Sequence, residues 1–164
     1  MLNAQLLVQI QFTKNMPERI SYVTDDGVTI IGDWVTAPTT VGAVILLHML
    51  PASRASWAAF QHTLGERGLA SLAIDLRGHG NSVKGPGGKP LDYKKFSEEE
   101  HASSIGDVRG AFQWIRSRGI DRERITVAGA SLGANLALQF LSEEPRVPVA
   151  ALLSPGETYH GVNV

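Results

Sequence analysis

The segment G-A-S-L-G at residues 129–133 has the residue types and the spacing of a catalytic turn. It lies between the apolar residues 125–128 and an apolar-rich stretch at residues 134–141. G-x-S-x-G between a strand and a helix is the pattern of a nucleophile elbow, in which glycine avoids the clash that a Cβ atom two residues from the serine would cause. This turn lifts the hydroxyl of Ser131 above the sheet and directs the first amides of the new helix at the group that the serine attacks.

A serine hydroxyl is a poor nucleophile until a base removes its proton, and after an elbow of this kind the acid and then the histidine follow along the chain. The residues after Ser131 contain three carboxylates and one histidine, namely Glu143, Glu144, Glu157 and His160. Glu143 and Glu144 lie about 12 residues along the predicted helix, or about 18 Å from the serine, and are expected to be surface charges. Glu157 and His160 follow the last predicted strand and are therefore the candidates for acid and base within this chain.

The composition is that of an ordinary soluble domain. The 164 residues are 43% hydrophobic and 19% charged with a net charge of −1, so the sequence indicates neither a nucleic acid nor a strongly charged partner. The chain has no cysteine, which excludes disulfides and thiol chemistry and fits a reducing, cytoplasmic location. No two histidines have the spacing of metal ligands, so we expect no metal site.

No apolar run is long enough to span a membrane, so we expect no membrane partner. Residues 1–12 are mildly apolar but lack the basic start and the small-residue cleavage site of a signal peptide. We expect them to form an extra strand or a lead-in, within an N-terminal lead-in of residues 1–18.

Alternating strand and helix patterns predict an α/β protein with a mostly parallel sheet and helices on both faces. The hairpin signal D-D-G at residues 25–27 joins the first two strands, and a capping box at residues 97–100 begins a helix that Gly119 closes. The predicted strands are residues 20–24, 28–35, 43–47, 69–74, 125–128 and 149–153, and the predicted helices are residues 53–67, 97–119 and 132–141.

Three motifs resemble the α/β-hydrolase family, especially its dienelactone hydrolase and serine aminopeptidase branches. They are H-M-L-P at residues 48–51, D-L-R-G-H-G-N-S at residues 75–82, and the elbow at residues 129–133. Each follows a predicted buried strand, and their order and spacing match the family together. The resemblance covers about residues 19–164 and implies an α/β-hydrolase fold.

The resemblance implies a serine hydrolase that cleaves an ester, a thioester or an amide of a small-molecule acyl substrate through an acyl-enzyme on Ser131, without a cofactor. The amides of Met49 and Leu132 would form the oxyanion hole, although glycine is usual at the position of Met49. The family also implies two further strands after residues 149–153 and then the loops that hold the acid and the histidine. We therefore expect a domain that is incomplete at its C-terminus, and the alternative function is a catalytically incompetent fragment or scaffold.

The remaining polar residues near these motifs are expected to support the structure. His48 is expected to shape the oxyanion loop, and His79 to stabilise its turn by hydrogen bonds, with a role as base as the alternative. Asp75 and Arg77 are expected to form an ion pair that braces the same turn.

Two expectations concern the surface. His62 and His101 are expected to be solvated, because they lie on predicted helices without a partner pattern. Residues 149–153 carry neither charge nor proline, so as an edge strand they would lack the usual protection against self-association.

Overall fold

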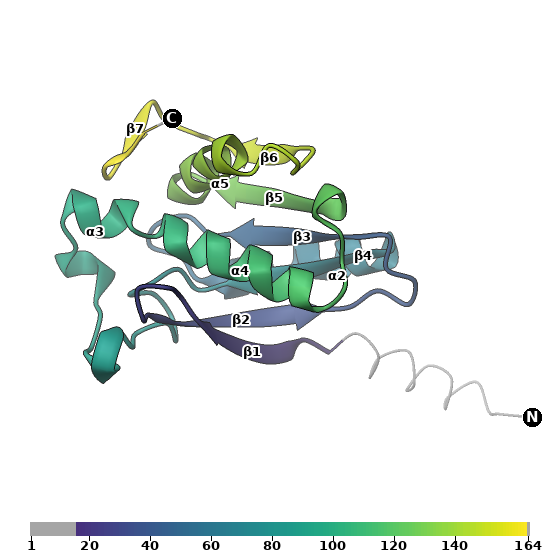
Figure 1. Ribbon diagram of the computed structural model, residues 1–164, viewed down its shortest axis with the longest axis horizontal. Helices are drawn as coiled ribbons and strands as arrows, with labels where there is room; N and C mark the ends of the chain where they lie inside the picture. Colours follow the sequence, from purple (N-terminus) through teal and green to yellow (C-terminus); the bar gives the residue numbers. More distant parts are fainter. Residues whose placement is uncertain (1–15, 164) are drawn as a thin grey trace, which may run out of the picture.

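The computed structural model describes residues 16–163, and the lead-in predicted for residues 1–12 lies outside this range. The main sheet has six strands in the order β1-β2-β4-β3-β5-β6 (Figure 1). The strands are β1 (Glu18–Val23), β2 (Thr29–Val35), β3 (Gly42–Leu47), β4 (Leu69–Ile74), β5 (Ile125–Ala130) and β6 (Ala150–Leu153). Every strand predicted from the sequence is therefore present.

The sheet is mostly parallel, as predicted. Strands β4, β3, β5 and β6 run parallel, whereas β2 runs antiparallel to its neighbours β1 and β4. In the β1–β2 hairpin, Gly27 has a φ of 83°. Glycine adopts this backbone conformation without steric cost, which explains why the D-D-G signal marks the turn.

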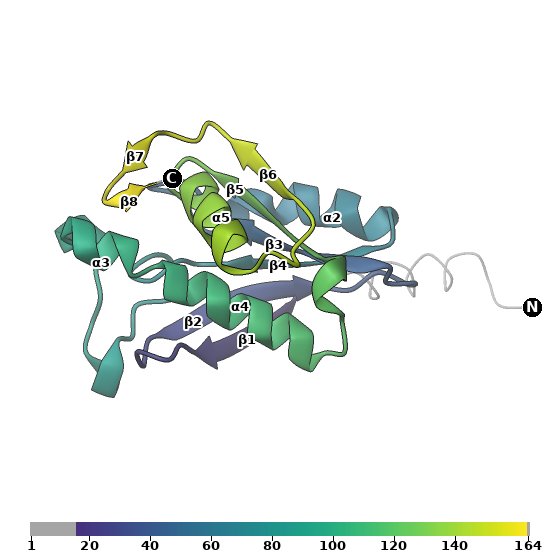
Figure 2. The ribbon, with the colours of Figure 1, turned by 45° about the horizontal axis from the view of Figure 1, so that its top comes forward.

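Helices cover both faces of the sheet (Figures 1 and 2). They are α2 (Ala58–Glu66), α3 (Glu98–Ala102), α4 (Ile105–Ser117) and α5 (Leu132–Glu143), with a 3-10 turn, η1 (Arg54–Trp57), before α2. Successive residues of β3 point to opposite faces: Leu47 packs in the cluster that contains Leu136 of α5, and Leu46 in the cluster that contains Leu64 of α2. All of β3 is buried, which accounts for its continuous apolar sequence.

The helix predicted for residues 97–119 is in fact two helices, α3 and α4. The predicted capping box is present, since the Ser97 side chain accepts from the Glu100 amide and the Glu100 side chain accepts from the Ser97 amide. The break lies at Ser103 and Ser104. The hydroxyl of Ser103 donates to the Glu100 carbonyl over 2.7 Å and accepts from Arg77 over 2.8 Å, and such side-chain bonds compete with a continuous helix. Within residues 16–163, no helix has both the length and the apolar character of a membrane span.

A short hairpin that the sequence pattern did not predict follows β6. Its strands, β7 (Thr158–Tyr159) and β8 (Val162–Asn163), pair antiparallel. His160 and Gly161 between them have φ values of 48° and 75°, and two successive residues with positive φ are characteristic of a tight type I′ turn. The hairpin and α3 lie together at the end of the sheet toward which β3, β5 and β6 run (Figures 1 and 2).

Candidate active site

Ser131 lies between β5 and α5 in a strained backbone conformation. Its φ is 52° and its ψ is −119°, a combination that residues with a side chain rarely adopt. Hydrogen bonds to both the amide and the carbonyl of Ser131 hold this conformation. The Ser131 amide donates to the carbonyl of Leu153 on β6 over 2.9 Å, and its carbonyl accepts from the amides of Ala134 and Asn135 over 2.8 and 3.1 Å. The side chain is half-buried at the carboxyl end of the sheet.

Both glycines of the elbow are required by the close approach of neighbouring backbone. A Cβ atom on Gly129 would overlap the carbonyl of Gly133 and lie 2.7 Å from the amide nitrogen of Ala134. A Cβ atom on Gly133 would overlap the carbonyl of Leu47 and lie 2.8 Å from the carbonyl oxygen of His48. The sharp turn that the glycine spacing predicts is therefore present.

The contact between Gly133 and the end of β3 brings the loop that carries Met49 to the first turn of α5, which carries Leu132. Within residues 16–163, neither the Met49 amide nor the Leu132 amide donates to a protein acceptor. The side chain of Met49 finds room by pointing outward, since this residue is 47% exposed. The two N–H groups therefore lie on the two segments that this contact joins, and the described part of the protein provides no acceptor for either.

His48 braces this loop, as predicted. Its Nε2 atom lies 3.1 Å from the amide nitrogen of Leu76, and its Nδ1 atom lies 2.9 Å from the carbonyl oxygen of Met49. Since the Leu76 amide can only donate, Nε2 accepts and Nδ1 carries the proton. Burial lowers the pKa of His48 below its ordinary value, which keeps the ring in this neutral form. His48 thus connects the loops that follow β3 and β4.

The predicted ion pair between Asp75 and Arg77 is wrong, because each residue pairs elsewhere. The Asp75 carboxylate accepts from the side chain and the amide of Arg54 on η1, and from the Asn81 amide over 2.7 Å. Arg77 instead donates to Asp107 of α4 over 2.9 Å. The two side chains therefore reach different elements, Asp75 the η1 turn before α2 and Arg77 the helix α4.

His79 stabilises its turn, as predicted. Its Nδ1 atom lies 3.0 Å from the carbonyl oxygen of Arg77, and its ring stacks on Tyr93 with 3.9 Å between the ring centroids. Burial lowers the pKa of His79 to about 4, with a smaller effect from His48. The ring is 3% exposed. These contacts give His79 a structural role.

The two candidates for acid and base lie on the segment after β6. Glu157 is exposed and precedes β7. His160 is exposed in the hairpin turn, with its ring 4.8 Å from that of His101 and 5.0 Å from that of Tyr159. Within residues 16–163, neither Glu157 nor His160 has a hydrogen bond to Ser131, so the structure does not bring the three together as a connected triad.

Glu143 and Glu144 lie near the far end of α5, as predicted, and each pairs with an arginine, which the sequence did not indicate. Arg109 donates to both carboxylate oxygens of Glu143 over 2.7 Å, and Arg122 donates to Glu144 over 2.7 Å.

At this end of the sheet, the sequence analysis did not identify the role of Asn135, and its expectation that His101 is solvated was wrong. Asn135 is fully buried one turn after Ser131; its amide group donates to the carbonyls of Gly156 and Val162 over 3.1 and 3.0 Å and accepts from the Gly156 amide over 3.0 Å. The sequence signal that could have indicated the role of Asn135 is a polar amide side chain in an otherwise apolar part of the helix. His101, which was expected to be solvated, is only 5% exposed, whereas His62 is exposed as expected.

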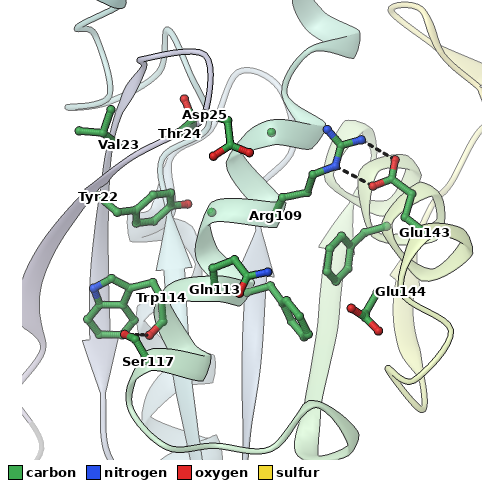
Figure 3. Close-up of a pocket in the computed structure, with 14 residues that line it drawn as sticks. Tyr22, Val23, Thr24, Asp25, Arg109, Gln113, Trp114, Ser117, Glu143 and Glu144 are labelled. Atoms are coloured by element: carbon green, nitrogen blue, oxygen red, sulfur yellow. Dashed lines mark hydrogen bonds and ion pairs between the residues drawn. The ribbon is translucent and has the colours of Figure 1, made fainter.

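A surface groove of about 510 Å³ lies over α4, away from the elbow (Figure 3). Tyr22 and Trp114 line one side, and the Arg109–Glu143 ion pair lines the other. Glu143 is the last residue of α5 and Ser131 precedes its first, so the groove lies about 18 Å from the serine. The groove is therefore not the site that the elbow defines.

Comparison with known proteins assigns the family. The family model described as alpha/beta hydrolase fold matches residues 42–161, so this chain belongs to the α/β-hydrolase fold family. The family resemblance and the fold class predicted from the three motifs are confirmed.

Relatives and solved structures agree with this assignment. An uncharacterized protein of Mycobacterium tuberculosis is 30% identical over 123 residues, covering 74% of this chain and 31% of the relative. The Pyrococcus furiosus esterase Pf2001 has a TM-score of 0.68 and 26% identity, covering 88% of this chain and 54% of the esterase. A Vigna radiata epoxide hydrolase has a TM-score of 0.62 and 21% identity, covering 84% of this chain and 38% of the epoxide hydrolase. This match shows similarity of fold alone. The chain thus spans about a third of the mycobacterial relative and about half of the esterase.

Proposed function

We propose that this protein is a serine hydrolase that cleaves an ester, a thioester or an amide of a small acyl substrate through an acyl-enzyme on Ser131. The observation that carries the proposal is the backbone of Ser131, strained at a φ of 52° between two glycines that packing requires. Strain of this kind persists where the surrounding structure holds a functional group in place. The esterase among the similar structures supports hydrolase chemistry.

The residue at the elbow favours acyl transfer over the chemistry of the epoxide hydrolase neighbour. In the epoxide hydrolase and haloalkane dehalogenase branches of the family, an aspartate occupies the elbow. Residue 131 is a serine. A serine hydroxyl attacks a carbonyl carbon, so an acyl-enzyme is the intermediate that this residue supports.

In the proposed reaction, the Ser131 oxygen attacks the substrate carbonyl while a histidine takes the hydroxyl proton. The negative charge that develops on the carbonyl oxygen is stabilised by the amides of Met49 and Leu132, each of which is worth about 3–4 kcal/mol in the transition state. The same histidine then protonates the leaving group, and water hydrolyses the acyl-enzyme.

We propose that the histidine and its carboxylate partner come from residues beyond Val164 in the parent protein. Two observations support this location of the histidine and the carboxylate. This chain spans only 54% of the Pyrococcus furiosus esterase, and within the described residues Ser131 has no hydrogen bond to Glu157 or His160. The same lack favours the second candidate function, a scaffold without chemistry of its own, for the 164 residues alone. If Glu157 and His160 do serve as acid and base, the 164 residues will hydrolyse p-nitrophenyl esters faster than their Ser131→Ala variant.

Covalent labelling tests the proposal. The protein, extended by the residues that its gene encodes after Val164, should react with a fluorophosphonate probe at Ser131, because the probe reports a serine whose proton is removed by a base. Ser131→Ala should abolish labelling. Ser142→Ala, on the exposed side of the same helix, should leave it unchanged. A probe found on another residue in the wild-type protein would show that the elbow assignment is wrong.

A further inference from the structure

The β7–β8 hairpin is docked at the carboxyl end of the sheet by a small number of specific contacts. Val162 is 1% exposed and belongs to the main core cluster. Asn135 on α5 holds the carbonyls of Gly156 and Val162. Gly161 lies against α3, where a Cβ atom would come within 2.6 Å of the carbonyl oxygen of Glu98. The hairpin is therefore closed against both α5 and α3.

Two histidines meet at this closure. The ring centroids of His101 on α3 and His160 in the hairpin turn are 4.8 Å apart, and the ring centroid of Phe96 is 5.4 Å from that of His101. His101 is 5% exposed, and its Nδ1 atom is buried without a hydrogen-bond partner within residues 16–163. The two rings pack against each other, so a positive charge on His101 would have neither water nor a partner at its Nδ1 atom.

The groups around the pair have opposing effects. Titratable groups lie on the elements packed around the two rings. They are Glu98, Glu99 and Glu100 in the first turn of α3, Glu157 and Tyr159 in the hairpin segment, and His79 and Tyr93 in the loop after β4. The first turn of α5 contains no acidic residue. Burial lowers the pKa of His101. The neighbouring rings of His160 and His79 lower this pKa further, whereas Glu100 raises it, and the net effect is a pKa below the ordinary histidine value. The docked hairpin therefore disfavours the protonated form of His101.

We propose that the β7–β8 hairpin is a pH-dependent latch, closed when His101 is neutral and released when His101 is protonated. Protonation places a positive charge on the buried ring of His101, beside the ring of His160, and opening of the hairpin exposes His101 to water. The sign follows from linkage: His101 takes up a proton in the open state that it excludes in the closed state, so closure is complete above the ordinary histidine pKa of about 6.5 and is lost as the pH falls below it.

The position of the latch gives it a consequence for the elbow. The hairpin is joined to Leu153, whose carbonyl accepts from the Ser131 amide, and it is held by Asn135, whose amide donates to the Ser131 carbonyl. Opening would release the segment that covers this end of the sheet while β5 and β6 remain paired. The latch does not depend on whether Ser131 is a nucleophile.

Hydrogen–deuterium exchange of the 164-residue chain tests the latch without any catalytic assay. The opening constant of a peptide covering residues 154–163 is measured at pH 7.5 and at pH 5.0, after correction for the intrinsic exchange rate. We expect it to rise at least about tenfold at pH 5.0, since uptake of one proton changes an equilibrium up to tenfold per pH unit. A peptide from β3 reports global unfolding, and the rise in the hairpin peptide should persist in the His79→Asn variant, in which the acid-induced loss of global stability is reduced. An opening constant that is the same at both pH values would overturn the proposal.

Two variants identify the groups responsible. His160→Asn retains a residue that tolerates positive φ before Gly161, and it should reduce the pH effect. His101→Phe replaces a ring that has an unsatisfied nitrogen with one that has none, so the docked structure should persist. The double variant should show less than about a twofold change between the two pH values, whereas His62→Asn on α2 should retain the full effect. A tenfold change that persists in the double variant would contradict the latch.

Discussion

Gly133 lies so close to the end of β3 that a Cβ atom on it would be 2.8 Å from the carbonyl oxygen of His48. This contact fixes the distance between the loop that carries Met49 and the first turn of α5. Because the obstacle is backbone at the centre of the sheet, it cannot move aside as a flexible side chain can.

Gly133→Ala should therefore destabilise the protein by about 3 kcal/mol, at the upper end of the usual cost of overpacking. Gly65→Ala is the matched control: Gly65 lies near the end of α2 without a positive φ, and a Cβ atom there meets only ordinary contacts, 3.8 Å from Val35, so alanine should not destabilise the protein. Urea unfolding followed by circular dichroism measures both changes. Equal effects of the two substitutions would show that the elbow is looser than described.

Asn135 should be the most sensitive polar residue of α5. Asn135→Ala leaves the amide and carbonyl of Gly156 and the carbonyl of Val162 without their partner, which should cost about 2–4 kcal/mol. Gln139 lies on the same helix, and its side-chain oxygen is buried without a partner within residues 16–163. Gln139→Ala should change the free energy of unfolding by less than about 1 kcal/mol. A cost for Asn135→Ala no larger than that for Gln139→Ala would refute the role assigned to Asn135.

The stability of the protein should decrease in mild acid because of His79. Burial lowers the pKa of His79 from 6.5 to about 4, so between these pH values the unfolded chain binds a proton that the folded protein excludes. The free energy of unfolding should fall by about 1–3 kcal/mol between pH 7 and pH 4.5 from this residue, after allowance for solvent screening.

The free energy of unfolding is measured as a function of pH for the wild type and for His79→Asn. The difference between the two profiles isolates the contribution of His79, because every other titrating group is common to both proteins. His62→Asn serves as the control, since the side chain of His62 is 61% exposed. Parallel pH profiles of stability for the wild type and His79→Asn would show that the buried ring does not resist protonation.

The edge of the sheet at β6 should mediate self-association. Within the described residues, β6 pairs only with β5, and Val149 and Leu153 beside this edge are 53% and 50% exposed. We expect dimers or larger species in sedimentation velocity at micromolar concentration. Ala151→Lys places a charge on the exposed edge and should shift the population to monomer, whereas Ala59→Lys on α2 should not. A strictly monomeric wild-type chain with a sharp thermal transition would contradict this prediction.

The features predicted correctly from the sequence are those with local signals. Continuous apolar runs mark the buried strands, and the spacing of Gly129 and Gly133 marks the elbow, because a few neighbouring residues determine each of them.

The features that were missed depend on contacts between residues far apart in the chain. The partner of Asp75 is Arg54, 21 residues earlier, and no local pattern distinguishes it from the nearer Arg77. His101 packs against His160 of the β7–β8 hairpin, and the hairpin in turn is held by Asn135 and by the fit of Gly161 against α3. Two-residue strands of this kind have too little sequence for a periodic pattern, so their position follows only from tertiary packing.

In the proposed mechanism, Ser131 carries the acyl group during turnover. The most direct measurement is mass spectrometry of the protein, extended by the residues encoded after Val164, quenched during hydrolysis of a slowly deacylating p-nitrophenyl ester. We predict a mass increase of one acyl group on the peptide that contains Ser131, and neither this adduct nor turnover in Ser131→Ala. An acyl group on a different residue, or full turnover in Ser131→Ala, would contradict the account.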